Sequence, residues 1–225
     1  MVCQIMTLCP VYNYVIGTFF EEMVIMRKNK TKWMVKVAML SAVAVVLMLL
    51  EFPLPFIAPP FYELDFSEIP VLVGAFALGP VAGVVIEAIK VLLNLLINGT
   101  ITGGVGEVAN FLVGIAFILP AGIIYKRNKS KKTAATGMTV GGVLMVVISC
   151  FVNTYILIPA YGAAMGLEVS AFVKMAAAIH PSIDSLWKMI LLCVAPFNTV
   201  KVILVSVITT VLYKHISPIL KGKMQ

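Results

Sequence analysis

Charged side chains are scarce in this sequence. Asp, Glu, Lys and Arg make up 12% of its 225 residues, whereas they make up about 25% of an ordinary soluble domain. Hydrophobic residues make up 61%, and a soluble core of this size could not bury so much apolar surface. A helix needs about 20 apolar residues to cross the hydrocarbon layer, and several such stretches follow one another between short polar breaks. We therefore predict an all-α integral membrane protein without a soluble globular domain.

Motifs for catalysis and for nucleotide or metal binding are missing as well. The sequence has no G-x-x-x-x-G-K-S/T, no H-E-x-x-H and no G-x-S-x-G. Its four cysteines form no C-x-x-C pair, so they indicate neither a zinc cluster nor a disulfide framework. These absences argue against an enzyme and predict no catalytic residue, metal site or cofactor. The predicted membrane segments also lack the acidic relay of an ion-driven transporter, so any transport would take its energy from a partner.

The net charge of +7 is better explained by membrane topology than by nucleic acid binding. The basic residues cluster beside apolar segments instead of following one polar face. Three clusters, at residues 27–36, 126–132 and 214–223, hold 13 of the 17 Lys and Arg residues. Because cytoplasmic loops are rich in Lys and Arg, these clusters predict an even number of crossings with both termini in the cytoplasm.

Six transmembrane helices are predicted. We expect them at residues 33–50, 69–78, 81–97, 107–125, 133–159 and 196–213. The second has too few residues to cross a bilayer straight, so either its flanks help it or it lies partly inside the protein. In the long outer loop, residues 160–195, an amphipathic segment at 170–178 is expected to form a short helix over the outer face.

The domain organisation follows from these spans. Residues 1–31 are expected to be a cytoplasmic or peripheral extension, with a start at Met26 as the alternative. Residues 32–220 form the predicted membrane domain, and residues 221–225 form a C-terminal tail.

Polar side chains gather in the outer half of the predicted membrane domain. An ionisable group there costs at least about 2.5 kcal/mol on insertion scales, so each needs a partner or a function. Together these groups would suit a ligand with several hydroxyl or carbonyl groups. In the alternative, Glu107 pairs with Lys201 and the asparagines only tie helices together. The cluster comprises Glu107 and Asn110 of the fourth predicted helix, Asn153 and Tyr155 of the fifth, and Asn198 and Lys201 of the sixth.

Two other pairs have the spacing of one helix face. Glu87 and Lys90, three residues apart, are predicted to form a structural ion pair within the third helix. Ala38 and Ala42, four apart near the cytoplasmic end of the first helix, would let another helix approach closely. That helix belongs either to a partner or to the same chain.

Four segments carry a family resemblance. LDFSEIP (residues 64–70), GAFALGPVAG (74–83), GEVANFLVG (106–114) and PAGIIYK (120–126) resemble the riboflavin-specific S components of energy-coupling factor (ECF) transporters. The resemblance covers about residues 32–220. It implies a six-helix subunit of the bacterial cell membrane that captures riboflavin outside as a transported ligand. Such a subunit delivers the vitamin when docked on a membrane coupling protein, the T component, with two cytoplasmic ATPases.

The resemblance also assigns roles to residues. It implies that Ala38 and Ala42 face the coupling protein. It further implies that riboflavin binds Asn153 and Lys201, with Asn198 one turn before the lysine, and that the loop around Leu54, Phe56 and Ala58 covers the flavin ring. An S component for another small vitamin, a membrane scaffold protein and an intramembrane protease remain the alternatives.

Overall fold

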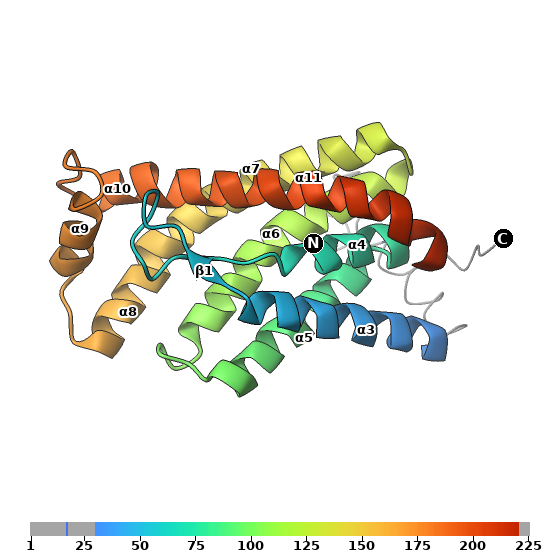
Figure 1. Ribbon diagram of the computed structural model, residues 1–225, viewed down its shortest axis with the longest axis horizontal. Coiled ribbons are helices and arrows are strands. Elements are labelled where there is room, and N and C mark those ends of the chain that lie inside the picture. The colour runs from blue at the N-terminus through green and yellow to red at the C-terminus, as the bar shows by residue number, and fades with distance from the viewer. Residues whose placement is uncertain (1–16, 18–29, 221–225) are drawn as a thin grey trace, which may run out of the picture.

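The computed structural model describes residue 17 and residues 30–220 of the chain. The predicted N-terminal extension and C-terminal tail therefore lie almost entirely outside the described residues. Figure 1 shows a bundle in which some helices run along the long axis of the molecule and others are inclined to it. The described helices and strands are α3 (Lys30–Leu49), β1 (Phe52–Pro53), β2 (Glu63–Leu64), α4 (Glu68–Leu78), α5 (Pro80–Asn98), α6 (Val105–Arg127), α7 (Lys131–Val152), the π-helix η1 (Asn153–Leu157), α8 (Ile158–Met165), α9 (Val169–Ala177), α10 (Leu186–Met189), the π-helix η2 (Ile190–Val194) and α11 (Ala195–Leu220).

Five helices are long and apolar enough to cross a membrane. They cover Lys30–Leu49, Pro80–Asn98, Val105–Arg127, Lys131–Met165 and Leu186–Tyr213. Their outer faces carry large apolar side chains in contact with the surroundings, which suits lipid and not water. Examples are Met39, Val46, Leu96, Val143, Ile203 and Val207, each more than half exposed.

The second predicted helix is not a full span. Its counterpart, α4, has 11 residues. Residues 68–76 are all buried, so this helix lies inside the protein, packed against α3, α5, α6 and α11. Gly79 then adopts a φ of 110° and Pro80 begins α5, which produces the tight reversal between the two helices.

The predicted limits of the fifth and sixth helices are wrong at their outer ends. The fifth continues to Met165 through η1, and the sixth begins ten residues early, at Leu186, and passes through η2. Pro159 is the predicted end of the fifth helix and Pro196 the predicted start of the sixth, because proline lacks an N–H donor and clashes with the preceding turn. Each proline instead lies two residues after a π-helical segment, whose wider turn changes the hydrogen-bond pattern. The amphipathic segment predicted at 170–178 is confirmed as α9.

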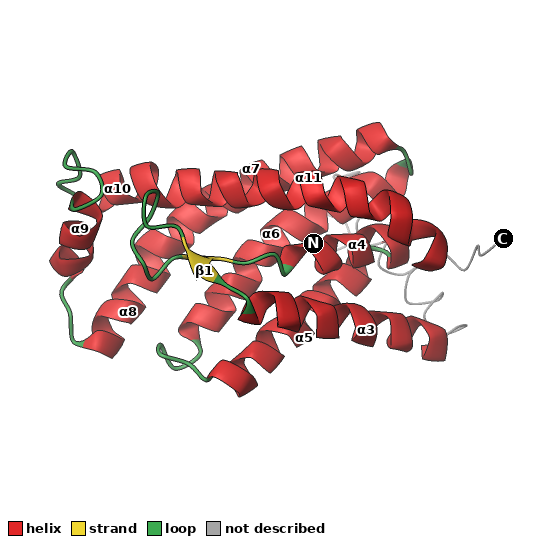
Figure 2. Cartoon of the chain, viewed as in Figure 1, coloured by secondary structure: helices red, strands yellow, loops and turns green. Residues whose placement is uncertain are grey.

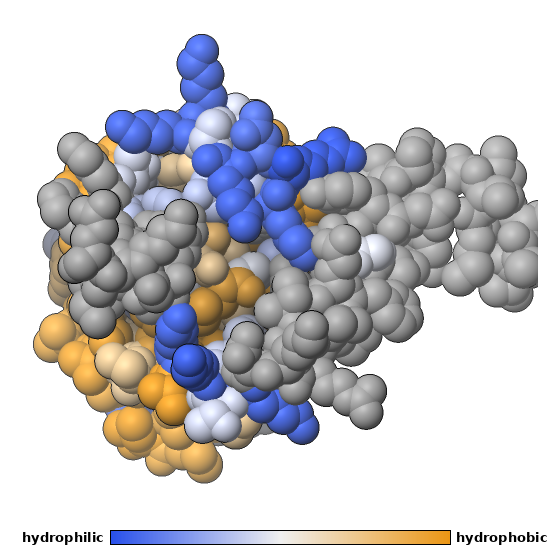
Figure 3. Space-filling view, turned by 90° about the vertical axis from the view of Figure 1, so that its right-hand side faces the viewer, coloured by the Kyte–Doolittle hydropathy of each residue, from blue (hydrophilic) through white to orange (hydrophobic). Residues whose placement is uncertain are grey.

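The chain is mostly helical, as predicted, and its described part adds one short β-ribbon. β1 and β2 form a two-stranded antiparallel ribbon in which Phe52 pairs with Leu64. Figure 2 shows this ribbon beside the loop that it closes, at the same end of the bundle as α8, α9 and α10. The opposite end contains the α6–α7 turn, and hydrophilic side chains gather on the face that it presents in Figure 3. The exposed basic residues of this turn are Arg127, Lys129, Lys131 and Lys132.

Candidate binding site

A cavity of about 330 Å³ lies at the end of the bundle that carries the β-ribbon, since Glu63 of β2 and the preceding loop residues Phe61 and Tyr62 line it. Its volume lies in the range of about 300–1,000 Å³ that is typical of small-molecule pockets. The wall comes from the β1–β2 loop, the facing ends of α5 and α6, η1 with α8, and the first turns of α11. The lining combines aromatic rings with polar groups, among them Phe61, Tyr62, Tyr161, Phe197, Asp65, Asn94, Asn98, Glu107, Asn110, Ser149, Asn153, Asn198 and Lys201.

All three asparagines predicted for the site line this cavity, and two of them, Asn153 and Asn198, are connected with a π-helical segment. Asn153 is the first residue of η1 and is 4% exposed. Its Nδ2 donates to the Ser149 carbonyl at 2.8 Å, and its Oδ1 accepts from the Tyr62 hydroxyl at 2.7 Å. Asn198 donates through Nδ2 to the carbonyl of Val194, the last residue of η2, at 2.9 Å. Such bulges occur frequently at functional sites, because they redirect side chains from a regular helix face.

The amide oxygens of Asn198 and Asn153 differ in their hydrogen bonding: that of Asn153 accepts from Tyr62. Within the described part of the chain, Asn198 Oδ1 accepts no hydrogen bond. Asn198 therefore offers a cavity ligand an acceptor that is already oriented by the bond from its Nδ2.

Lys201 pairs with Asp65, a residue that the sequence did not identify as part of the site. Lys201 Nζ lies 2.7 Å from Asp65 Oδ2, and both side chains are buried. Asp65 Oδ1 accepts from the backbone N–H of Ser67 at 2.8 Å and also from its hydroxyl. Burial alone would raise the pKa of Asp65, but the ammonium groups of Lys201 and Lys90 and these hydrogen bonds lower it to about 2. The carboxylate is therefore ionised, and it fixes Lys201 at the cavity wall.

Glu107 does not neutralise Lys201, so the predicted alternative for this pair is wrong. Glu107 Oε2 instead accepts from the Thr100 hydroxyl at 3.0 Å, in the turn between α5 and α6. Glu107 and Asn110 both line the cavity, on the face of α6 that their spacing predicted.

The structure places Tyr155 outside the cavity. Its ring is 65% exposed, stacks on Phe151 and contacts the edge of Trp187. Asn153 and Tyr155 are only two residues apart in η1, which is less than a helical turn, so their side chains point in different directions.

The loop after α3 borders the cavity, but through residues other than those predicted. Leu54 and Ala58 pack in a separate apolar cluster with Phe172 of α9, and Phe56 is 69% exposed. Phe61 and Tyr62 line the cavity instead. The turn in which Ile57 and Ala58 donate their N–H groups to the Leu54 carbonyl directs the first part of the loop toward α9.

Four aromatic rings form one wall of the cavity. The ring centroids of Phe61 and Tyr62 lie 4.7 Å apart, those of Phe61 and Tyr161 6.2 Å, and those of Tyr62 and Phe197 5.9 Å. Burial raises the pKa of Tyr62, so its hydroxyl remains a neutral donor to Asn153. A flat aromatic ligand would find stacking partners on this wall and hydrogen-bonding groups in the same cavity.

Two carboxyl groups meet at the mouth of the cavity. Glu51 precedes β1 and Glu63 begins β2, and both line the opening. Partial burial of the Glu51 carboxyl raises its pKa, as do the negative charges of Glu63 and Asp65, and the resulting value is about 7. Glu51 therefore changes its charge near physiological pH.

The stability of the protein should decrease as the pH rises from about 5 to about 8. Glu51 holds its proton in the folded state at a pH where the unfolded chain has released it, so deprotonation costs folding free energy over this interval. Because the side chain is open to solvent, screening reduces the effect. Thermal unfolding in detergent measures it. Glu51→Gln should remove much of the slope, while Glu107→Gln, another carboxyl at the cavity, should retain it; an unchanged slope in Glu51→Gln would rule out this assignment.

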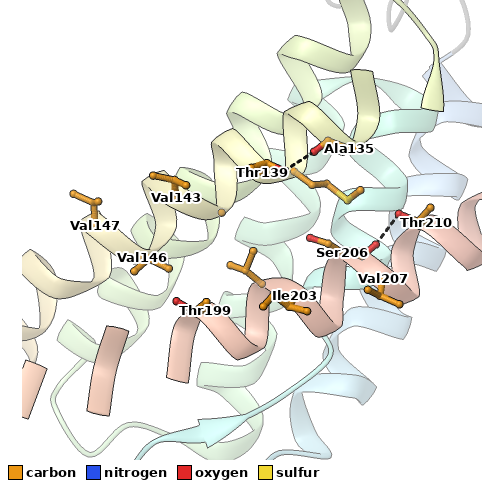
Figure 4. A pocket seen from close by; sticks show the side chains of 13 residues that line it. Ala135, Thr139, Val143, Val146, Val147, Thr199, Ile203, Ser206, Val207 and Thr210 are labelled. Atoms are coloured by element: carbon orange, nitrogen blue, oxygen red, sulfur yellow. Dashed lines mark hydrogen bonds between the residues drawn. The ribbon is translucent and has the colours of Figure 1, made fainter. Parts of the chain in front are cut away.

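A second depression, of about 500 Å³, lies between α7 and α11 and has a different chemistry. Figure 4 shows it lined by Val143, Val147, Ile203 and Val207, with hydroxyl groups between them. Thr139, Thr199 and Thr210 each donate to a backbone carbonyl four residues earlier in their own helix. This apolar surface on the outside of the bundle suits lipid chains better than a polar solute.

Ala38 and Ala42 lie on the outward face of α3. Both are exposed, whereas Val37, Ser41 and Ala44 face the interior. Packing within the described chain therefore leaves the two alanines available to a partner helix.

The chain resembles a known family over most of its length. Residues 32–213 match the family model described as ECF transporter, substrate-specific component. The chain is 36% identical over 196 residues to the riboflavin transporter RibU of Staphylococcus aureus (strain TCH60), covering 87% of this chain and 95% of that protein. It is 34% identical over 190 residues to the riboflavin transporter FmnP of Bacillus subtilis (strain 168), covering 84% and 94%. A solved structure, described as the S component of a bacterial ECF transporter, matches with a TM-score of 0.67 and 34% identity, covering 85% of this chain and 99% of that one.

Proposed function

The chain belongs to the substrate-specific components of ECF transporters, and from this premise we propose that its cavity binds riboflavin for uptake into the cell. It is a multi-pass protein of the bacterial cell membrane and not an enzyme. The observation that carries the proposal is one cavity whose lining combines aromatic rings with oriented amide and ammonium groups. The similarity to proteins named riboflavin transporters supports this choice of ligand over another vitamin.

The aromatic and the polar lining groups of the cavity suit the two parts of riboflavin. The isoalloxazine ring is flat and largely apolar, so the wall of Phe61, Tyr62 and Phe197 would stack against it. The ribityl chain carries hydroxyl groups, each of which can donate and accept a hydrogen bond. We propose that the ribityl chain binds to Asn153, Asn198 and Lys201. Glu107 and Asn110 of α6 complete the polar part of the lining.

We also propose that the chain works with a T component and two cytoplasmic ATPases. The sequence contains no nucleotide-binding motif, and membership in a family of ECF transporter components supports an external ATP-driven module as the source of energy. The outward face of α3 at Ala38 and Ala42 is the proposed docking surface.

For the topology, we propose six membrane helices, counting the short buried α4, with both termini in the cytoplasm. The basic α6–α7 turn supports this orientation, and α9 would then be external. In a background without the native cysteines, Ser170→Cys in α9 should react with a membrane-impermeant thiol reagent on intact cells, while Ser130→Cys should react only after permeabilisation. Reaction at residue 130 in intact cells would invert the orientation.

The visible absorption spectrum of the purified protein tests the ligand. Protein produced in riboflavin-containing medium should carry a flavin absorption band in about one equivalent per chain. The band should disappear after unfolding and removal of the ligand, and should return when riboflavin is added. A colourless protein that binds no added riboflavin would favour another vitamin or a scaffold role.

A further inference from the structure

Five ionisable side chains form a buried network at and beneath the cavity wall. Lys201 pairs with Asp65, as described above, and Lys90 Nζ lies 2.9 Å from Glu68 Oε1 and 2.8 Å from Glu87 Oε2. The second contact confirms that Glu87 and Lys90 face each other within α5, as their spacing predicted. The Lys201–Asp65 pair and the cluster around Lys90 also interact electrostatically. Lys90 acts on Asp65, and Glu68 acts on Lys201. Each of the five residues is at most 7% exposed.

The network has an excess of acidic groups. It contains three carboxyl groups and two ammonium groups, so full ionisation would leave one uncompensated negative charge inside the membrane domain. An isolated buried charge is so unfavourable that a titratable group takes up or releases a proton instead. One of the three carboxyl groups is therefore expected to be protonated.

Hydrogen bonds distinguish the three carboxyl groups. Asp65 accepts from Lys201 and twice from Ser67. Glu68 accepts from Lys90 and lies in the first turn of α4, where the helix dipole stabilises a negative charge. Glu87 has only Lys90, which it shares with Glu68: its Oε2 lies 2.8 Å from Lys90 Nζ, and no other described residue donates a hydrogen bond to it. The ionised form of Glu87 is consequently the least stabilised of the three.

The surroundings of Glu87 offer little further compensation. Its Oε1 lies against Gly114 of α6, so close that a Cβ at that position would be 2.3 Å away. The charged groups that act on it are Glu68 of α4, Lys90 of its own helix and Lys201 of α11. The buried face of α3 contains no ionisable residue. Its members are Val37, Ser41, Ala44, Val45 and Met48.

We propose that this network is a proton-binding site and that Glu87 carries the proton at neutral pH as a neutral carboxylic acid. The remaining charges then balance, with two carboxylates facing two ammonium groups. The neutral carboxyl group of Glu87 then packs against Gly114, and Lys90 forms its ion pair with the ionised Glu68. The proposal concerns the ligand-free protein and does not depend on the identity of the transported vitamin.

Infrared spectroscopy of the purified ligand-free protein tests the proposal, because a protonated carboxyl group and a carboxylate absorb at different frequencies. Spectra are taken at about pH 7 in a Glu51→Gln background, because Glu51 itself titrates near this pH. This protein should show a protonated carboxyl band that is lost when Glu87→Gln is added and kept when Glu107→Gln is added. Absence of the band in the Glu51→Gln protein, or its persistence after Glu87→Gln, would overturn the assignment.

Thermal unfolding provides a second measurement. Glutamine has nearly the shape of a neutral glutamic acid, so Glu87→Gln should keep the Tm of the wild type. Lys90→Met, which leaves Glu68 without its buried partner, should lower the Tm markedly. An equal loss of Tm in the two variants would mean that Glu87 is an ionised partner of Lys90, and the proposal would be wrong.

Discussion

Asn153→Ala and Lys201→Ala should each weaken riboflavin binding by tenfold or more, which corresponds to about 1.4 kcal/mol. Both side chains line the cavity, and both are held in place by other groups, Asn153 by Ser149 and Tyr62, Lys201 by Asp65. Removing an oriented group leaves a polar atom of the ligand unpaired in a largely buried site, at a cost of about 1–3 kcal/mol. Titration of flavin fluorescence measures the affinity.

Lumiflavin separates contacts to the ribityl chain from contacts to the ring. It keeps the ring but lacks the hydroxyl groups, so its affinity should change little in either variant. Thr199→Ala is the matched control in α11, because Thr199 is exposed in the lipid-facing depression and donates only to its own helix. An equal loss of affinity for both flavins would mean that Asn153 and Lys201 shape the ring site or the fold instead of binding the ribityl chain.

Removal of Lys201 has a second consequence within the protein. It leaves the buried Asp65 carboxylate without its ammonium partner, and breaking a buried pair in this way can cost several kcal/mol. A folded-state control is therefore needed, and Lys201→Arg supplies it because it keeps the positive charge. We expect this variant to retain the Tm of the wild type and to lose part of its riboflavin affinity, since the guanidinium group places its donors differently.

The parts of this site that the sequence could predict depend on local patterns. Apolar length identified the five long helices, and the positions of Asn153, Asn198 and Lys201 within them placed polar groups at one level. Spacing alone put Glu107 and Asn110 on one face of α6. Each of these inferences needs only the geometry of a single helix and the direction in which it crosses the membrane.

The parts that it could not predict depend on contacts between distant segments. The ion pair of Lys201 with Asp65 joins residues 136 positions apart, and nothing local distinguishes Asp65 from a solvated acid before a helix. The beginning of the sixth predicted helix was missed because Pro196 has the pattern of a helix start, while the π-helical turn that accommodates it has no sequence signature. The loop residues that reach the cavity, Phe61 and Tyr62, depend on how the β-ribbon directs the chain.

Ala42→Trp should abolish riboflavin uptake while leaving riboflavin binding nearly unchanged. Ala42 is exposed on α3 and lies one helical turn from Ala38, so the two leave a flat surface on which another helix can pack closely. An indole group there would hold a docking helix away, but it would not reach the cavity at the other side of α3. Binding by the purified protein and uptake by cells that contain the complete transporter measure the two properties separately.

Two matched variants decide whether this surface is specific. Val143→Trp introduces the same bulk at an exposed apolar position of α7, a helix that does not pack against α3, and should keep both binding and uptake. Ala44→Trp forces the indole into a position that is 0% exposed and should impair both, because overpacking distorts the core. If Ala42→Trp behaved like Ala44→Trp, the alanine would serve packing within the subunit. If it behaved like Val143→Trp, the partner would dock elsewhere, and the outward face of α3 would contact only lipid.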